Sequence, residues 1–364
     1  MVDTLYIYYN FKSYEEYKKA VALTDEFVEA NANKSKDTLH KDNKHPYSVV
    51  TYMFANKGFE EIRFRSLFDN GYYAIEILLR PKLLVDKNNY INVLYEDEVD
   101  TARNKFNKFL QDKVGLDVPD MLKWKVKRID YAIDIRVKQD LIPQYIELFK
   151  HGNIPHYALE NEVTQMWFNK ANNFYLVNKN YVVNFYDRYA TLQIKQKQYN
   201  KKFTDIERAK SLLRLEIQLT VSTDKMKRKG QITKNELGQF LNVELCKSYI
   251  MQHFDSIIGA GNYYTIETAK SKCKSDVLYD IIKLINSEGS IHAAKELYLL
   301  NKRNPDRVAK RFSKLINDLR RKNVNPVILP EHFNCNKLKG LRPIIEEYFD
   351  AGFIRIKRRK KNYE

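Results

Sequence analysis

The chain has 364 residues, a net charge of +17 at pH 7 and a pI of about 9.4, and is long enough for two domains or one large one. Hydrophobic residues make up 44% of it, which provides a sizeable core, and eleven glycines and nine prolines exclude a low-complexity chain. No run of about eighteen apolar residues is present, which excludes a transmembrane helix, and the first residues lack the basic segment of a signal peptide.

The N-terminal 220 residues have the alternating patterns of strands and helices. Strands are expected at 1–10, 49–54, 59–66, 72–79, 124–137, 164–169, 174–178, 181–186 and 212–221, helices at 13–33, 97–113 and 139–150, and one or two polar helices over 187–210. Ser13 and Glu16 have capping-box spacing, Asn70-Gly71 favours a hairpin turn, and 31–48 is expected to be a polar connection. The prediction is an α+β fold with a mostly antiparallel central sheet flanked by helices.

Four polar residues interrupt segments that otherwise resemble buried strands. They are Glu76, Asp130 and Glu216 on three strands, and Tyr186 at the end of a fourth. Strand side chains alternate between faces, so these acids fall on the polar face, and a solvated sheet face is the commoner explanation for any one strand. Repeated Arg-x-Asp and Arg-x-Glu pairs favour a site, because an ionised carboxylate in a strand core is costly unless it is paired or binds a metal. The pattern therefore predicts a metal site beside a nucleophile on one sheet face.

The pattern changes after Ser222. The segment 225–230 is expected to be a linker, and Thr233 and Glu236 form a capping box that opens a helix. Further helices are expected at 244–257, 264–286, 290–300 and 306–322. The last two resemble a helix-turn-helix DNA reader, with generic helix packing as an equally weighted alternative. This gives a catalytic domain over 1–224 and a mainly helical DNA-binding domain with a basic tail over 225–364.

Positive charge is concentrated in this second part. Residues 1–220 sum to +4 and residues 221–364 to +13, and 301–330 contain nine basic and two acidic residues. A basic tail follows at Arg355–Lys361. The distribution predicts binding to nucleic acid, although a lysine-rich surface from an AT-rich genome is an alternative that explains the arginines less well. The three cysteines lie far apart without zinc-ligand spacing, which predicts a reduced, cytoplasmic setting.

Four short stretches, taken in order, resemble a known family. They are Glu76-Ile-Leu-Leu-Arg-Pro-Lys-Leu-Leu84, Arg128-Ile-Asp130, Asn184-Phe-Tyr-Asp-Arg188 and Arg214-Leu-Glu216. Together they resemble the rolling-circle replication initiators, in particular the gene II replication proteins of filamentous phages and the Rep_trans family of plasmid initiators. The likeness covers about 45–220 and, weakly, the C-terminal part, where the basic helix 306–322 also resembles the phage proteins.

The resemblance implies a role for each matched residue. Tyr186 falls at the nucleophile of the plasmid family, and Glu76, Asp130 and Glu216 fall on its recurrent carboxylates, which we assign as metal ligands. Arg188 stands where the family usually has lysine, and Arg128 and Arg214 are expected to steady the carboxylates or the phosphate. The chain has no His-hydrophobic-His pair, so carboxylates must hold the metal, which favours Mg²⁺ or Mn²⁺.

The implied activity is site-specific nicking and rejoining of origin DNA to start rolling-circle replication. A tyrosine oxygen attacks phosphorus, releases a 3′-hydroxyl and keeps a 5′-phosphotyrosine, with the metal polarising the phosphate. Tyr189 is held in reserve, because it lies three residues after Tyr186, and a lone loop histidine such as His45, His151 or His156 is more often solvated than catalytic. The alternatives are an origin- or operator-binding protein without catalysis and, less favoured, an RNA-binding protein that stacks bases on tyrosines.

The expected partners follow from this function. They are origin DNA, either single-stranded or as a supercoiled duplex, together with a host helicase and a single-strand-binding protein. No membrane association is expected, a homodimer is compatible with the role, and the expected location is the cytoplasm of a bacterial host cell.

Overall fold

The computed structural model describes residues 1–30, 35–41, 46–52, 58–67, 71–154, 173–178, 180–198, 203–220 and 223–350. They form two compact units. The first comprises the described residues of Met1–Ile133, Lys202–Thr204 and Gln218–Lys247, and the second those of Asp134–Lys201, Asp205–Ile217 and Ser248–Glu364. This division differs from the expected 1–224 and 225–364, because two central strands contribute residues to both units. The predicted division by role stays a prediction.

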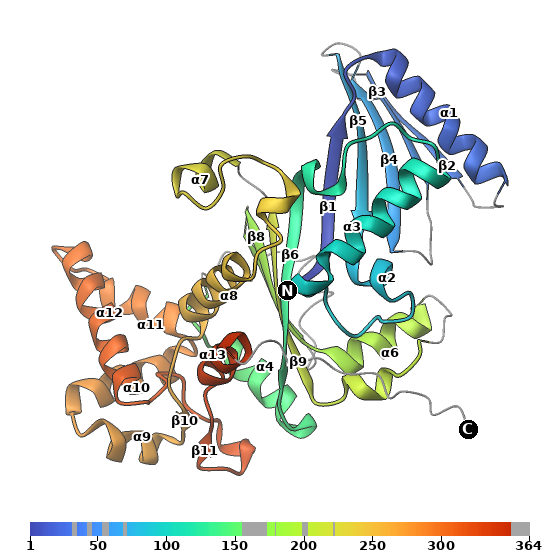
Figure 1. Cartoon of the computed structure of the whole chain (residues 1–364). Coiled ribbons are helices and arrows are strands. Elements are labelled where there is room, and N and C mark those ends of the chain that lie inside the picture. The colour runs from blue at the N-terminus through green and yellow to red at the C-terminus, as the bar shows by residue number, and fades with distance from the viewer. Residues whose placement is uncertain are drawn as a thin grey trace, which may run out of the picture. The chain divides into compact units, whose positions relative to one another are not determined.

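The fold class predicted from the sequence is confirmed: an antiparallel sheet with helices, followed by a helical C-terminal region (Figure 1). The sheet order is β2-β3-β4-β5-β1-β6-β9-β8-β7. The strands are β1 Val2–Asn10, β2 Ser35–Lys41, β3 Pro46–Tyr52, β4 Phe59–Leu67, β5 Tyr72–Leu79, β6 Lys125–Arg136, β7 Asn173–Asn178, β8 Tyr181–Asp187 and β9 Leu212–Thr220. A second, two-stranded sheet pairs β10 Tyr263–Tyr264 with β11 Lys337–Leu338.

In the first unit, helices cover one face of the sheet (Figure 1). They are α1 Tyr14–Ala30, α2 Pro81–Val85 and α3 Val99–Asn107; α7 Thr223–Arg228, later in the chain, also belongs to this unit. The backbone N–H of Glu16 donates to Ser13 Oγ at 3.2 Å, as the capping-box spacing predicts. Apolar positions on alternate residues of β1, β4 and β5 face these helices, and the ring of Tyr17 packs against Phe64 with centroids 6.0 Å apart. Burial of these rings accounts for the position of α1.

The second unit is mainly helical after its strands. Its helices are α4 Ile142–Lys150, α6 Arg188–Gln198, α8 Val243–Ile257 (shared with the first unit), α9 Ile266–Cys273, α10 Asp276–Glu288, α11 Ile291–Leu299, α12 Pro305–Arg321 and α13 Arg342–Asp350. Within the described part of the chain, no helix combines the length and apolar character that crossing a bilayer demands.

Several elements differ from the sequence predictions, each for a physical reason. The expected polar connection 31–48 contains β2, whose backbone pairs with β3. The expected linker 225–230 belongs largely to α7, where Met226 is buried. The helix expected at 264–286 is two helices, because Lys274 adopts a left-handed conformation with φ of 49°. The strand expected at 164–169 and the basic tail lie outside the described residues.

The capping box expected at Thr233 does not open a helix. The backbone N–H groups of Thr233 and Lys234 donate instead to Gln239 Oε1, at 2.7 and 3.1 Å. The side chain of Gln239 thus satisfies the donors that a helix N-terminus would leave open, and only a short 3₁₀ turn, Leu237–Gln239, follows.

Candidate active site

The structure brings three of the predicted site residues together in the second unit. The hydroxyl of Tyr186 donates to Glu216 Oε2 at 2.9 Å, and Arg188 Nη1 donates to the same hydroxyl at 3.3 Å. Tyr186 is 5% exposed, Glu216 6% and Arg188 2%. The phenol therefore has a carboxylate that can take its proton and a cation that favours its ionised form.

Local structure explains how these side chains meet. Strand β8 ends at Asp187, and helix α6 begins at the next residue. The backbone N–H of Ala190 donates to Asp187 Oδ1 at 3.0 Å, as in a helix N-cap, and Gln139 Nε2 donates to Asp187 Oδ2 at 2.6 Å. This cap fixes the turn from strand to helix, so that Tyr186 and Arg188 flank it while neighbouring β9 supplies Glu216.

Arg214, which was expected to steady the carboxylates or the phosphate, pairs with an acid on the neighbouring strand. Its Nε and Nη2 donate to the two carboxylate oxygens of Asp134, each at 2.7 Å. The Arg214 side chain is 0% exposed, and Asp134 belongs to the neighbouring strand β6. Arg214 therefore neutralises a buried acid on the strand beside β9, and a contact with a phosphate stays a prediction.

Glu76 lies in the first unit, in a second cluster of tyrosine, carboxylate and cation. Its carboxylate accepts a short hydrogen bond from Tyr6 and two from Lys127 Nζ, at 3.1 and 3.2 Å. Burial, and then the bond to Glu76, raises the pKa of the Tyr6 phenol above its usual range. Both effects favour the protonated form of this phenol.

Asp130 also lies in the first unit but does not join Glu76. Arg128 Nε and Nη2 donate to its two oxygens, each at 2.9 Å. In the sheet register Asp130 is opposite Thr4 and Glu76 is opposite Tyr8, so the two acids share a face but stand four residues apart along β1. That is about 13 Å at 3.3 Å per residue, with β1 between them, whereas oxygen ligands of one ion lie about 2.0–2.6 Å from it.

The acids therefore do not fit the three-carboxylate metal site that was expected. Glu76, Asp130 and Glu216 each accept hydrogen bonds from their own neighbours. Across the described ranges, no group of three or more His, Cys, Asp or Glu side chains is placed as metal ligands would be. Binding of Mg²⁺ or Mn²⁺ stays a prediction, and no step of the chemistry below is routed through an ion.

The reserve candidates have other partners. Tyr189 lies on α6, whereas Tyr186 lies on β8, so the two do not share a helical face. The Tyr189 hydroxyl donates to Glu207 at 2.6 Å. His45 and His156 both lie outside the residues that the structure describes.

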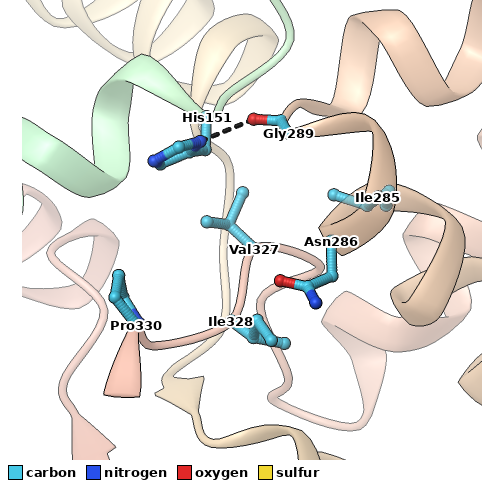
Figure 2. A pocket seen from close by; sticks show the side chains of 7 residues that line it. All are labelled: His151, Ile285, Asn286, Gly289, Val327, Ile328 and Pro330. Carbon is cyan, nitrogen blue, oxygen red and sulfur yellow. Dashed lines mark hydrogen bonds between the residues drawn. The ribbon is translucent and has the colours of Figure 1, made fainter. Parts of the chain in front are cut away.

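His151 has a structural position. Figure 2 shows its ring beside a small, mostly apolar hollow, with Nδ1 2.5 Å from the carbonyl oxygen of Gly289. The hollow is lined by His151, Ile285, Asn286, Gly289, Val327, Ile328 and Pro330. A carbonyl partner assigns the proton to Nδ1, and the bond ties the end of α4 to the junction of α10 and α11.

Sequence reasoning missed four residues that organise these clusters: Asp134, Asp187, Tyr6 and Lys127. Two signals were available: Asp134 lies on the same face of its strand as Asp130, and Asp187 stands inside the stretch Asn184-Phe-Tyr-Asp-Arg188. Tyr6 and Lys127 gave no signal, because they contact Glu76 from other strands. The pattern of one strand does not show which strands lie beside it.

The chain has no recognised relative in any of the comparisons made. No family model, no curated protein and no solved structure matches it. The functional argument therefore depends on the geometry of these residues and on the motif resemblance alone.

Proposed function

We propose that the chain is a DNA strand transferase that nicks and rejoins origin DNA through Tyr186 to start rolling-circle replication. The observation that carries the proposal is the hydrogen bonding of the Tyr186 hydroxyl to Glu216 and Arg188. The motif resemblance supports it, because the three residues that meet here come from two of the four stretches. A host helicase and a single-strand-binding protein belong to the same proposal.

In each transfer one P–O ester bond breaks and another forms, so no external energy source is required. Glu216 takes the phenolic proton as the Tyr186 oxygen attacks phosphorus, the bond to the 3′-oxygen breaks, and the released 3′-oxygen takes up a proton. Arg188 stabilises the negative charge that develops on the phenolic oxygen. Attack by the same or another 3′-hydroxyl reverses these steps and rejoins the strand.

Burial of the three residues adds a requirement. Because Tyr186 is 5% exposed, a phosphodiester reaches its oxygen only after the side chains over it have moved. Cleavage must therefore include an opening step before the Tyr186 oxygen can meet a phosphodiester.

The same burial favours one alternative. In an origin- or operator-binding protein without catalysis, the hydrogen bonds of Tyr186, Glu216 and Arg188 would only hold the sheet together. Such a protein binds DNA and never forms a covalent adduct, so the two functions separate in one assay.

Duplex binding is assigned to the C-terminal helices. The exposed basic residues of 301–322 are Lys302, Arg303, Arg307, Lys310, Arg311, Lys314, Arg321 and Lys322. Arg320 differs, because its Nη2 donates to the carbonyl of Asp255 at 3.4 Å and burial lowers the pKa of its guanidinium. Helix α12 begins at a capped end, where the N–H of Arg307 donates to Asn304 Oδ1 at 3.1 Å. This arrangement is compatible with a DNA-reading helix on α11 and α12.

The test is adduct formation on a random pool of single-stranded oligonucleotides, with Mg²⁺, with Mn²⁺ and with chelator. A 5′-phosphotyrosine keeps the downstream fragment, so a label at the 3′ end should stay with the denatured protein and a label at the 5′ end should leave. Tyr186→Phe should abolish the adduct while DNA binding is kept, and Tyr189→Phe is the matched control that should form it normally.

Each outcome decides between the two functions. An adduct lost only in Tyr186→Phe supports strand transfer, and loss of the adduct with chelator supports the predicted ion. DNA binding by the wild type without any adduct supports the non-catalytic alternative. A Tyr186→Phe protein that still forms the adduct refutes the assignment of the nucleophile.

A further inference from the structure

One face of the sheet in the first unit gathers tyrosines and basic side chains. The register places Tyr8 opposite Lys125 and Glu76, Arg63 opposite Glu76, and Tyr6 opposite Arg128. Directly paired residues of antiparallel strands share a face. We call this the tyrosine face, and its charged and aromatic members are Tyr6, Tyr8, Glu61, Arg63, Arg65, Tyr72, Glu76, Lys125, Lys127, Arg128 and Asp130.

The tyrosine face is the side opposite the helices. The other face packs Phe64 against Tyr17 of α1 and Phe59 against Phe106 of α3. Figure 1 shows these two helices on the same side of the sheet. By contrast, Tyr6, Tyr8 and Tyr72 are each partly exposed.

Charge and aromatic rings are combined on this face. It carries five basic and three acidic side chains, and all three acids are paired: Glu61 with Arg63 at 2.7 Å, Glu76 with Lys127, and Asp130 with Arg128. Lys127 Nζ lies 4.6 Å from the centre of the Tyr6 ring, and Lys125 Nζ lies 5.8 Å from that of Tyr8.

The spacing of the rings favours an unpaired strand. Tyr6 and Tyr8 are two residues apart on β1, about 6.6 Å along the strand, whereas successive phosphates of a duplex strand are about 3.4 Å apart along the axis. Two neighbouring bases that stack on these rings must therefore separate from each other. A single strand allows this separation, but a duplex does not.

We propose that the tyrosine face is a binding platform for single-stranded DNA, with bases stacked on Tyr6, Tyr8 and Tyr72 and phosphates beside Arg63, Arg65, Lys125 and Lys127. Aromatic rings beside basic side chains are the usual combination for single-strand binding without sequence preference. The inference goes beyond the proposed function, because it concerns the other compact unit and needs no chemistry at Tyr186.

The test measures the affinity of a fluorescent oligo-dT by anisotropy, in a Tyr186→Phe background that prevents covalent attachment. Tyr8→Ala should weaken binding about 5- to 150-fold, the range for the loss of one base–aromatic stack. Lys125→Ala should lower the magnitude of the log–log salt slope by about 0.7, the value for one phosphate contact on a single strand. Lys125 is exposed, so this variant does not depend on repacking of the core.

Matched controls use the same residue types elsewhere. Tyr8→Phe keeps the ring and should keep the affinity, and Tyr14→Ala and Lys19→Ala, on helix α1, should bind like the wild type. The proposal is overturned if Tyr8→Ala and Lys125→Ala bind oligo-dT as tightly as these controls, or if oligo-U binds more tightly than oligo-dT. A wild type that forms no adduct would refute strand transfer and leave this measurement intact.

Discussion

The ion pair between Arg214 and Asp134 should be the polar contact of the second unit that is most sensitive to mutation. The Arg214 guanidinium is fully buried, and two of its nitrogens donate to the Asp134 carboxylate at 2.7 Å. Asp134→Asn keeps the shape of the side chain but removes the charge that compensates Arg214. Breaking a buried pair in this way should lower the free energy of unfolding by about 3–5 kcal/mol, because one charge stays buried without its partner.

Urea unfolding followed by circular dichroism measures this change, with an unchanged m-value as the sign that only stability differs. The matched control is Glu15→Gln, which removes the exposed ion pair between Glu15 and Lys18 and should cost about 0–1 kcal/mol. The double variant Asp134→Leu with Arg214→Met should recover most of the lost stability, since well-packed apolar side chains replace a buried pair with little cost.

The reasoning fails if Asp134→Asn costs no more than Glu15→Gln. A second outcome would contradict the purely structural role of Arg214. In it, the double variant is stable and keeps the hydrogen bond between Tyr186 and Glu216, but forms no adduct. That result would return Arg214 to the catalytic role that the sequence predicted.

Three further outcomes are expected. If about five of the exposed basic residues of 301–322 neutralise phosphates, anisotropy with duplex DNA should give a log–log salt slope of about −4 to −5, and a slope near zero would contradict this. Burial acts to raise the pKa of the Asp120 carboxyl, but hydrogen bonds from Arg103, the Leu122 N–H and Asn107 outweigh burial and lower this pKa. The ionised carboxylate therefore stabilises the fold above its unfolded-state pKa, and this contribution is lost as pH falls through its folded-state pKa. Asp120→Asn should therefore be less stable than the wild type at pH 7. In thermal melts the difference in stability between the two proteins should become smaller below about pH 4, and a difference that does not change with pH would refute the role of the Asp120 charge. Glu76→Gln should tighten oligo-dT binding by removing a negative charge from the tyrosine face, whereas a metal-ligand role for Glu76 predicts loss of Mn²⁺-dependent adduct formation.

Local sequence patterns predicted several strands with nearly correct bounds. The strand expected at 72–79 is β5, and the strand expected at 181–186 is β8 with one more residue. Two-residue alternation is a property of each strand alone, so no knowledge of its neighbours is required. The helix expected at 264–286 failed at a single backbone conformation, that of Lys274, which hydrophobic periodicity does not encode.

The site was harder to predict because its contacts cross strands. The pairing of Arg128 with Asp130 lies within one strand and followed from the Arg-x-Asp spacing. The same spacing in Arg214-Leu-Glu216 did not reveal that Arg214 also reaches Asp134 on the adjacent strand β6. Strand order is set by long-range packing, so a pattern read along one strand cannot identify which acid lies beside it.

The burial of Tyr186 gives the tyrosine face an energetic role in the proposed reaction. Opening the buried site costs free energy, and contacts made by distant parts of the DNA can supply it. If stacking on Tyr8 is used in this way, Tyr8→Ala should lower the rate of adduct formation at saturating DNA as well as the affinity. If stacking only holds the strand, the variant should raise the DNA concentration needed for half-maximal rate and leave the saturated rate unchanged. Single-turnover kinetics of Tyr8→Ala beside Tyr8→Phe distinguish these cases, and an unchanged saturated rate would show that opening at Tyr186 draws nothing from the tyrosine face.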